Sequence, residues 1–294
     1  MFSTEDQYKV FKIPKKHGGF RQIEAPNDDL KKTQRTLLQL MKGQHFISPF
    51  VHSFRSGHNV VTNAKGHVGA EYVLHIDASN FFPSITWNKF RRIVGTYVYA
   101  GQKGVSEEEL KQCFCKFGDE QMERLPQGAP TSPWLSNIYL SRFDSTMARY
   151  MTFLGVPSEY NEPKKVSEYN YSRYADDITI SGPDKDRLWA IFFMMERRLA
   201  RRYGITLNRK KTRMMEPGHR KIVCGIVVNE KHHPKRRWRK NLRAEIHNQL
   251  VQGLELKAST KGKIAYLEMC RNTQGRGSSE EIFMHRNAKV LEDF

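Results

Sequence analysis

The spacing of hydrophobic and polar positions changes several times along the chain, and each change marks a different predicted element. Residues 9–26 carry short apolar and basic stretches on both sides of a His-Gly-Gly sequence at 17–19, and prolines bound them. This pattern is typical of two strands joined by a turn. Residues 28–42 begin with two acids and continue with apolar residues near helical spacing, which predicts a helix.

The middle of the chain alternates apolar runs with helical patterns. Residues 72–76 form a short apolar run, which predicts a buried strand that ends at Asp77, followed by a turn and a helix after Pro83. A second helix is predicted from about Pro133, because proline is favoured at a first helical position. Residues 156–170 are polar and predict a surface loop. The interleaved pattern indicates a mixed α and β fold.

Two adjacent acids stand at the tip of a predicted hairpin. Residues 169–182 alternate aromatic and polar positions on both sides of an Ala-Asp-Asp triplet, which favours two strands that meet at the triplet. A helix is predicted over 186–204, where a glycine ends it. Residues 221–229 contain a mostly apolar stretch and are predicted to form a strand.

The last third of the chain combines an amphipathic helix with most of the positive charge. Apolar residues recur every four positions from Trp238 to Leu250, so one face of this helix should pack and the other should be basic. Residues 197–243 hold 17 of the 49 Lys and Arg residues and only two acids, in a chain of net charge +18. This charge predicts a polyanionic partner, and nucleic acid fits best. A merely solvated charged face is the alternative, but such faces normally mix signs. Residues 273–279 are expected to form a flexible loop.

The composition also bears on the compartment. No apolar run approaches the roughly 20 residues of a membrane span, and the N-terminal residues are polar, unlike a secretory signal. We therefore expect a soluble, cytoplasmic protein without a membrane partner. The cysteines do not have C-x-x-C spacing, so we expect free buried thiols rather than a zinc site or disulfides. They are Cys113, Cys115, Cys224 and Cys270.

Three aspartates are the candidates for chemistry. Asp77 lies at a predicted strand end, and Asp176 and Asp177 at the hairpin tip. Carboxylates that meet in this way repel one another unless a cation is present, and Mg²⁺ prefers hard oxygen ligands. Two such ions can stabilise the attacking and leaving oxygens of an in-line phosphoryl transfer. An Asp-Asp pair alone is more often a turn or a helix cap, so the surrounding sequence decides.

The surrounding segments resemble the motifs of reverse transcriptases. Residues 174–177, Tyr-Ala-Asp-Asp, resemble the YxDD box, and Asp77 with two phenylalanines soon after it resembles the first catalytic motif. Residues 125–133, LPQGAPTSP, match LPQG-x-x-x-SP, and residues 204–212 match G-x-x-x-N-x-x-KT. Residues 224–229 resemble the primer-grip hairpin. The motifs follow the family's order from about residue 12 to residue 229.

Two further features resemble the retron branch of this family. Residues 63–67, NAKGH, match its NAxxH box, and residues 223–225, Val-Cys-Gly, stand where that branch has Val-Thr-Gly. The cysteine lacks the threonine hydroxyl, which puts any RNA contact through that hydroxyl in doubt. The resemblance implies RNA contacts by Asn63, His67, Val223 and Gly225. Without the family, His67 also fits a histidine satisfied in a turn.

The resemblance implies a metal site with a nearby lysine. Asp77, Asp176 and Asp177 would hold two Mg²⁺ ions, or Mn²⁺, and the backbone carbonyl of Ala78 would add a ligand. Lys211 resembles the lysine proposed to protonate departing pyrophosphate, although a plain phosphate contact is the alternative.

The resemblance also implies a nucleotide pocket. Phe82 would clash with a 2′-hydroxyl and so select deoxynucleotides, unless it is an ordinary core aromatic. Gln127 would line the pocket. Lys15 and Arg21, on the predicted fingers hairpin, could clamp the triphosphate or could belong to a general RNA-facing surface.

The implied architecture is a right-hand polymerase of mixed α and β structure. Fingers would cover residues 1–70 with parts of 88–125, the palm 71–220, and a primer grip and basic thumb 221–294. The thumb would grip a template–product duplex or a specific structured RNA. Its RNA-binding residues would be Arg236, Arg237, Trp238, Arg239 and Lys240.

The implied function is RNA-directed DNA synthesis. A retron enzyme would copy a dedicated noncoding RNA, prime from an internal 2′-hydroxyl to give branched RNA–DNA, and act with an effector protein in antiphage defence. The length leaves no room for an RNase H domain, so we expect another enzyme to remove the template.

Two alternatives stay open. A group II intron-like or abortive-infection reverse transcriptase would work without a cognate RNA, and residues 63–67 argue against it. A noncatalytic RNA-binding protein with a degenerate palm would have no need to keep all three aspartates.

Overall fold

The computed structural model describes residues 7–15, 18–42, 47–101, 105–117, 120, 122–154 and 168–271. The loop predicted at 156–170 falls mostly outside these residues, and the one at 273–279 falls wholly outside them. The elements are β1 (Tyr8–Pro14), β2 (Phe20–Pro26), α2 (Asp28–Lys42), α3 (Val60–Lys65), β3 (Tyr72–Asp77), α4 (Phe81–Ser84), α5 (Trp87–Gly101), α6 (Glu107–Lys111), α7 (Ser132–Leu154), β4 (Asn170–Tyr174), β5 (Asp177–Gly182), α8 (Lys185–Arg198), the π-helical turn η1 (Leu199–Tyr203), β6 (Arg213–Met215), β7 (Ile222–Val223), β8 (Ile226–Val227), β9 (His233–Pro234), α9 (Arg236–Val251) and α10 (Ala258–Arg271).

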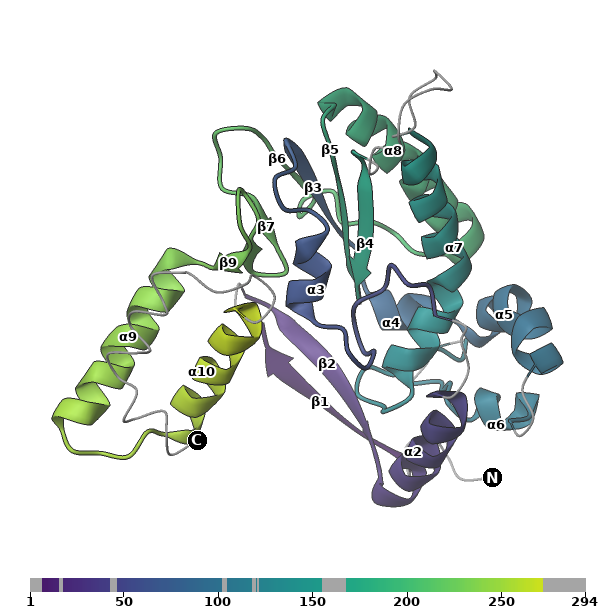
Figure 1. Ribbon diagram of the computed structural model, residues 1–294. Coiled ribbons are helices and arrows are strands. Elements are labelled where there is room, and N and C mark those ends of the chain that lie inside the picture. The colour runs from purple at the N-terminus through teal and green to yellow at the C-terminus, as the bar shows by residue number, and fades with distance from the viewer. Residues whose placement is uncertain are drawn as a thin grey trace.

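A four-stranded antiparallel sheet forms the centre of the molecule, in the order β4-β5-β3-β6. Helices α7 and α8 lie along one side of it and α3 lies on the other (Figure 1). Because successive side chains of a strand point to opposite faces, β3 contributes to two cores. Leu74 and Ile76 belong to the larger core, with residues of α7 and α8, while Val73 packs with α3, β7 and β8. The sheet is therefore covered on both faces.

The hairpin β1–β2 stands apart from this sheet (Figure 1). Its strands pair antiparallel from Tyr8 with Pro26 to Pro14 with Phe20. Most of its side chains are exposed, and only Tyr8 in β1 and Glu24 in β2 are buried. The hairpin is thus fixed to the rest of the molecule near its base.

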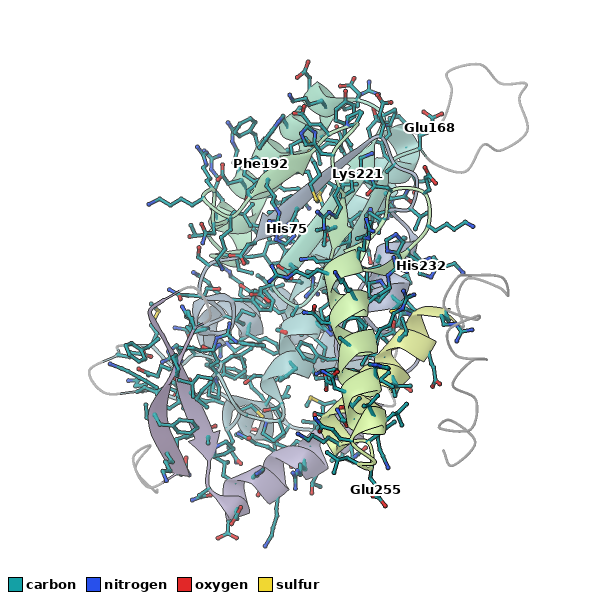
Figure 2. The ribbon with its side chains drawn as sticks, turned by 90° about the vertical axis from the view of Figure 1, so that its left-hand side faces the viewer. His75, Glu168, Phe192, Lys221, His232 and Glu255 are labelled. Atoms are coloured by element: carbon teal, nitrogen blue, oxygen red, sulfur yellow. The ribbon has the colours of Figure 1, made fainter. Side chains whose placement is uncertain are left out.

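Helices α9 and α10 form a separate pair joined to the sheet side by the small sheet β7-β8-β9 (Figure 1). Leu242 and Ile246 of α9 pack with Leu256 and with Ile264 of α10. Figure 2 shows Glu255 at the end of this pair remote from the sheet that contains His75. The prediction that one face of the helix after Trp238 packs is confirmed.

Several predicted elements are confirmed with close bounds. The hairpin at 9–26, the helices at 28–42 and from about 133, the strand that ends at Asp77 and the hairpin at 169–182 are all present. The helix predicted to end at Gly204 does so, through η1, and Gly204 adopts a φ of 65° that suits glycine.

Two predictions need correction. The helix expected after Pro83 is two helices: α4 begins at Phe81 and includes Pro83, and the longer α5 begins at Trp87. The single strand predicted at 221–229 is wrong, because the chain reverses at Cys224 and Gly225, which have φ values of 46° and 87°. These left-handed residues form the turn between β7 and β8.

The mixed fold class is confirmed, whereas the bounds of fingers, palm and thumb stay a prediction. Cys113, Cys115 and Cys270 are buried, as expected, and Cys224 is partly exposed. Among the helices that the structure describes, none is long and apolar enough to cross a bilayer.

Candidate active site

The three candidate aspartates meet at one edge of the central sheet. Asp77, the last residue of β3, pairs in register with Asp177, the first residue of β5. Asp176 lies in the turn between β4 and β5, and its carbonyl accepts a hydrogen bond from the Ala78 N–H at 3.1 Å. Two strand ends and one tight turn therefore place carboxylates from distant parts of the chain together.

Burial and mutual repulsion perturb the carboxylates at this edge of the sheet. Burial, followed by the charges of Asp176 and Asp77, raises the pKa of Asp177 to about 7. Burial also raises the pKa of Asp176, with Asp77 adding to the effect and Arg21 and Lys211 opposing it. The raised pKa values indicate carboxylates that a further cation would stabilise.

Two basic side chains already contact these carboxylates. The Lys211 ammonium donates to both carboxylate oxygens of Asp77, at 3.0 and 3.1 Å. His75 Nε2 lies 3.5 Å from an oxygen of Asp177. The sequence identified Lys211 but missed His75, whose position within an apolar strand gives no signal of a polar partner. Lys211 thus lies against the candidate carboxylates, and its role there stays a prediction.

A divalent cation would have to be held by these carboxylates. Within the described residues, no three His, Cys, Asp or Glu side chains are placed so that they could hold a metal ion. Lys211 occupies the oxygens of Asp77 instead. The donor chemistry nonetheless fits Mg²⁺, because three hard carboxylates share one edge and two of them have raised pKa values. These carboxylates are the residues that would hold it.

A cavity of about 430 Å³ opens beside the carboxylates. The predicted nucleotide-binding residues line it together with two residues of the carboxylate edge: Lys15, Arg21, Phe82, Gln127, Asp176 and Lys211. Phe82 also packs against the larger core and beside the ring of Phe81, at 5.4 Å between centroids. The structure therefore joins the nucleotide candidates to the carboxylates in one site.

A buried ion pair that sequence reasoning missed supports this cavity. Glu24 of β2 accepts two hydrogen bonds from Arg124, at 2.8 and 3.1 Å, and one from the Gln127 N–H at 2.6 Å. Glu120 binds the other side of the Arg124 guanidinium. Burial opposes the charge of Glu24, but these partners lower its pKa overall. The pair ties the hairpin β1–β2, which the sequence predicts to be part of the fingers and which we call the fingers hairpin, to the LPQG segment.

The NAxxH residues that were predicted to contact RNA, Asn63 and His67, lie in the interior of the molecule. His67 is 1% exposed, and its Nδ1 and Nε2 contact the hydroxyls of Ser181 and Ser172 at 2.7 and 2.8 Å. Burial, with a smaller effect of His52, lowers the pKa of His67 to about 3. Asn63 is also buried, and its side chain donates to Cys224 Sγ at 3.4 Å. Both side chains face the interior, which does not favour direct RNA contact, and their RNA-binding role stays a prediction.

The predicted RNA contacts near the C-terminus divide between surface and interior. Val223 is fully buried, so its side chain cannot reach RNA, whereas Gly225 is exposed at the turn. Trp238 is partly buried and packs against the ring of Tyr266 at 5.2 Å between centroids, and its RNA contact stays a prediction. Arg239 is partly buried, and burial with two neighbouring arginines lowers its pKa. Arg236, Arg237 and Lys240 are exposed on α9 and remain candidates.

Comparison with known proteins places this geometry among polymerases. Residues 13–262 match the family described as reverse transcriptase, RNA-dependent DNA polymerase. The retron Ec86 reverse transcriptase of Escherichia coli is 30% identical over 84% of this chain and 72% of its own length. The retron Mx65 reverse transcriptase of Myxococcus xanthus is 34% identical over 91% of this chain and 62% of its own length. The chain spans 60% of the Mx162 enzyme of the same organism.

Solved structures show the same fold at low sequence identity. A telomerase from Candida albicans in complex with a fragment of telomeric RNA aligns with a TM-score of 0.55 and 12% identity, over 82% of this chain and 50% of that chain. Apo telomerase from Candida tropicalis, truncated from its C-terminal domain, gives a TM-score of 0.52 and 15% identity, over 78% and 55% of the two chains. These similarities support the right-hand polymerase fold alone.

Proposed function

Since this chain belongs to the reverse transcriptases, and within them to those of bacterial retrons, we propose that it synthesises DNA on an RNA template. The observation that carries the proposal is the paired register of Asp77 and Asp177 beside a cavity lined with cations. A polymerase needs carboxylates and a triphosphate pocket at one place, and the proposal is supported by carboxylates that lie beside a cavity with cationic side chains. When held by the three aspartates, Mg²⁺ or Mn²⁺ would stabilise negative charge on the attacking and leaving oxygens of the phosphoryl transfer.

The protein's own side chains have separate tasks in this proposal. Lys15 and Arg21 bind the phosphates of the incoming nucleotide, and Phe82 excludes a 2′-hydroxyl from the cavity. Gln127 lines the same cavity, held through its backbone by Glu24. Lys211 supplies a positive charge, and a proton, where pyrophosphate departs. Each of these residues lines the cavity beside Asp176.

The proposed substrate follows the retron relatives. A structured noncoding RNA serves as template and, through an internal 2′-hydroxyl, as primer, so that the product is single-stranded DNA branched from RNA. The exposed cations of α9 grip the duplex through its phosphates, since A-form helices are bound mainly by shape and backbone. The proposal extends to a cytoplasmic role in antiphage defence with an effector protein.

The test is to purify the chain from cells that carry its own flanking DNA, and to treat the bound nucleic acid separately with RNase and DNase. The proposal expects a discrete DNA covalently joined to RNA. That DNA should vanish in the variant Asp176→Ala/Asp177→Ala and persist in Asp186→Asn, an exposed acid in the first turn of α8.

Two other outcomes separate the alternatives. Bound RNA without branched DNA, from an enzyme that copies any primed RNA, would keep the polymerase and remove the retron RNA. RNA binding without any synthesis, equal in wild type and in the double alanine variant, would favour a noncatalytic RNA-binding protein.

A further inference from the structure

The turn that carries Asp176 has a backbone conformation that its sequence does not favour. Tyr174 and Asp177 pair across the hairpin, so Ala175 and Asp176 make the whole turn. Ala175 has a φ of 56°, in the left-handed region that residues with a Cβ seldom adopt. Such a conformation costs on the order of 1 kcal/mol and persists only where the surroundings hold it. The position of both adjacent carboxylates depends on this residue.

Both backbone polar groups of Ala175 are held by buried side chains. The Ala175 N–H donates to the Ser53 hydroxyl at 2.8 Å, and the Ala175 carbonyl accepts from Arg173 Nη1 at 3.0 Å. Ser53 and Arg173 are each 0% exposed. Ser53 lies in a segment distant in sequence, and its own carbonyl accepts from Asn137 of α7 at 2.9 Å. The turn is therefore fixed from two sides.

Arg173 is itself held in one orientation. Its Nε and Nη2 donate to the two carboxylate oxygens of Asp144 on α7, at 2.9 and 2.8 Å. Its Nη1 also donates to Asn137 Oδ1 at 3.2 Å. The Tyr171 hydroxyl donates to Asp144 at 2.6 Å. Because these partners fix the planar guanidinium of Arg173, its Nη1 can point in only one direction, toward the Ala175 carbonyl.

We propose that Ser53 and Arg173 are positioning residues, which hold the Ala175 turn so that Asp176 and Asp177 face Asp77 correctly. The inference rests on the proposed polymerase activity. Neither residue belongs to a motif that the sequence singled out, and neither lines the cavity. Their effect should fall on the chemical step, because a catalytic group displaced by about 1 Å can cost on the order of 100-fold in rate.

The test uses Ser53→Ala in the full chain, purified with its RNA, in single-turnover extension. We expect the rate of nucleotide addition at saturating dNTP to fall about 10- to 100-fold, while the dNTP concentration for half-maximal rate stays within about twofold. Ser136→Ala is the matched control: Ser136 is also 0% exposed and its hydroxyl binds the Pro133 carbonyl, but it does not touch the turn. Its rate should stay near that of wild type.

A second variant separates positioning from general destabilisation. Adding Ala175→Gly to Ser53→Ala removes the Cβ that disfavours the left-handed conformation, so the double variant should recover part of the lost rate. Folded Ser53→Ala protein with a wild-type rate would overturn the inference, and so would a lost rate that glycine does not restore. If wild type itself makes no DNA, the proposed function fails first and independently.

Discussion

Two hairpins converge on the candidate active site, and they are built in opposite ways. The catalytic hairpin β4–β5 buries the middle of β4 and all of β5 after Asp177. The fingers hairpin β1–β2 exposes all but one residue of β1 and has one buried residue in β2. The first hairpin positions carboxylates, and the second brings Lys15 and Arg21 to the cavity.

The difference lies in how each hairpin is anchored. His67 and Ser53 bind the hairpin β4–β5 through hydrogen bonds, and Arg173 of β4 binds the buried Asp144 of α7. The fingers hairpin is anchored near its base, where Glu24 binds Arg124 and Gln127. A segment with many buried contacts has a high free energy of local opening, and a segment with few such contacts has a low one. We therefore expect β4–β5 to open locally less readily than β1–β2.

The largest expected effect comes from the catalytic hairpin. Asp177→Asn keeps the size of the side chain but removes its charge, so we expect the rate of RNA-templated DNA synthesis to fall by at least about 10³-fold. Single-turnover primer extension measures it. Asp186→Asn, an exposed acid in the first turn of α8, is the control and should stay within about twofold of wild type. Activity near wild type in Asp177→Asn would remove the carboxylate edge from the mechanism.

The next effect concerns stability. His67→Ala leaves two buried serine hydroxyls, Ser172 and Ser181, without their partner and opens a cavity behind the hairpin. We expect the free energy of unfolding to fall by about 2–4 kcal/mol. Urea denaturation measures the loss, and His247→Ala, exposed on α9, is the control. A loss below about 0.5 kcal/mol would contradict a bracing role for His67.

The fingers hairpin should respond in binding rather than in rate. The substitution Glu24→Gln removes the negative charge and replaces one of the two carboxylate oxygens that accept from Arg124 with an amide nitrogen. The anchor of the hairpin therefore weakens. We expect the KM for dNTP to rise about 10- to 30-fold with kcat changed less than about threefold. Steady-state primer extension measures KM and kcat. The control is Glu108→Gln, which changes an exposed acid of α6. A loss confined to kcat would make the two hairpins equivalent.

The sequence revealed those parts of the site that local patterns encode. Asp77 follows an apolar run, and Asp176 and Asp177 interrupt an alternating pattern of aromatic and polar residues. These local patterns were enough to place the three aspartates at strand ends. The partners of these residues are long-range. Glu24 and Arg124 are 100 positions apart, and nothing in the spacing of either segment links them.

The sequence also did not fully predict which side chains face the interior and which face water. Trp238 stands among cations and was assigned to RNA, but its helical spacing with Leu242 already placed it on the packed face. His67 and Asn63 were assigned to RNA through a motif, yet a motif fixes residue types and does not fix whether they face water or the interior. The strand predicted at 221–229 missed the turn at Cys224, although residues 224–229 resemble a hairpin motif, because cysteine seldom adopts a left-handed conformation.

The smallest expected effect is a difference in how the stability contributions of His67, which binds the catalytic hairpin, and of Glu24 in the fingers hairpin depend on pH. His67 is held neutral, with its pKa lowered to about 3 by burial, so unfolding takes up a proton once the pH falls below about 6.5. Its contribution to stability is therefore present above pH 6.5 and declines as the pH falls. We expect the destabilisation caused by His67→Ala to shrink by about 1.4 kcal/mol between pH 7.5 and pH 5.5.

Glu24 has a linkage of the same sign but in a lower pH window, and it provides the internal control. Its pKa is lowered in the folded state by Arg124 and Gln127 against the effect of burial, so its contribution is complete above the unfolded pKa of about 4.5 and declines only below it. The destabilisation caused by Glu24→Gln should thus stay constant between pH 7.5 and pH 5.5. Urea denaturation of both variants at both pH values measures the two differences. If the His67→Ala difference also stays constant, His67 is not held neutral between its two serines, and the polar bracing that distinguishes the catalytic hairpin loses its best-placed member.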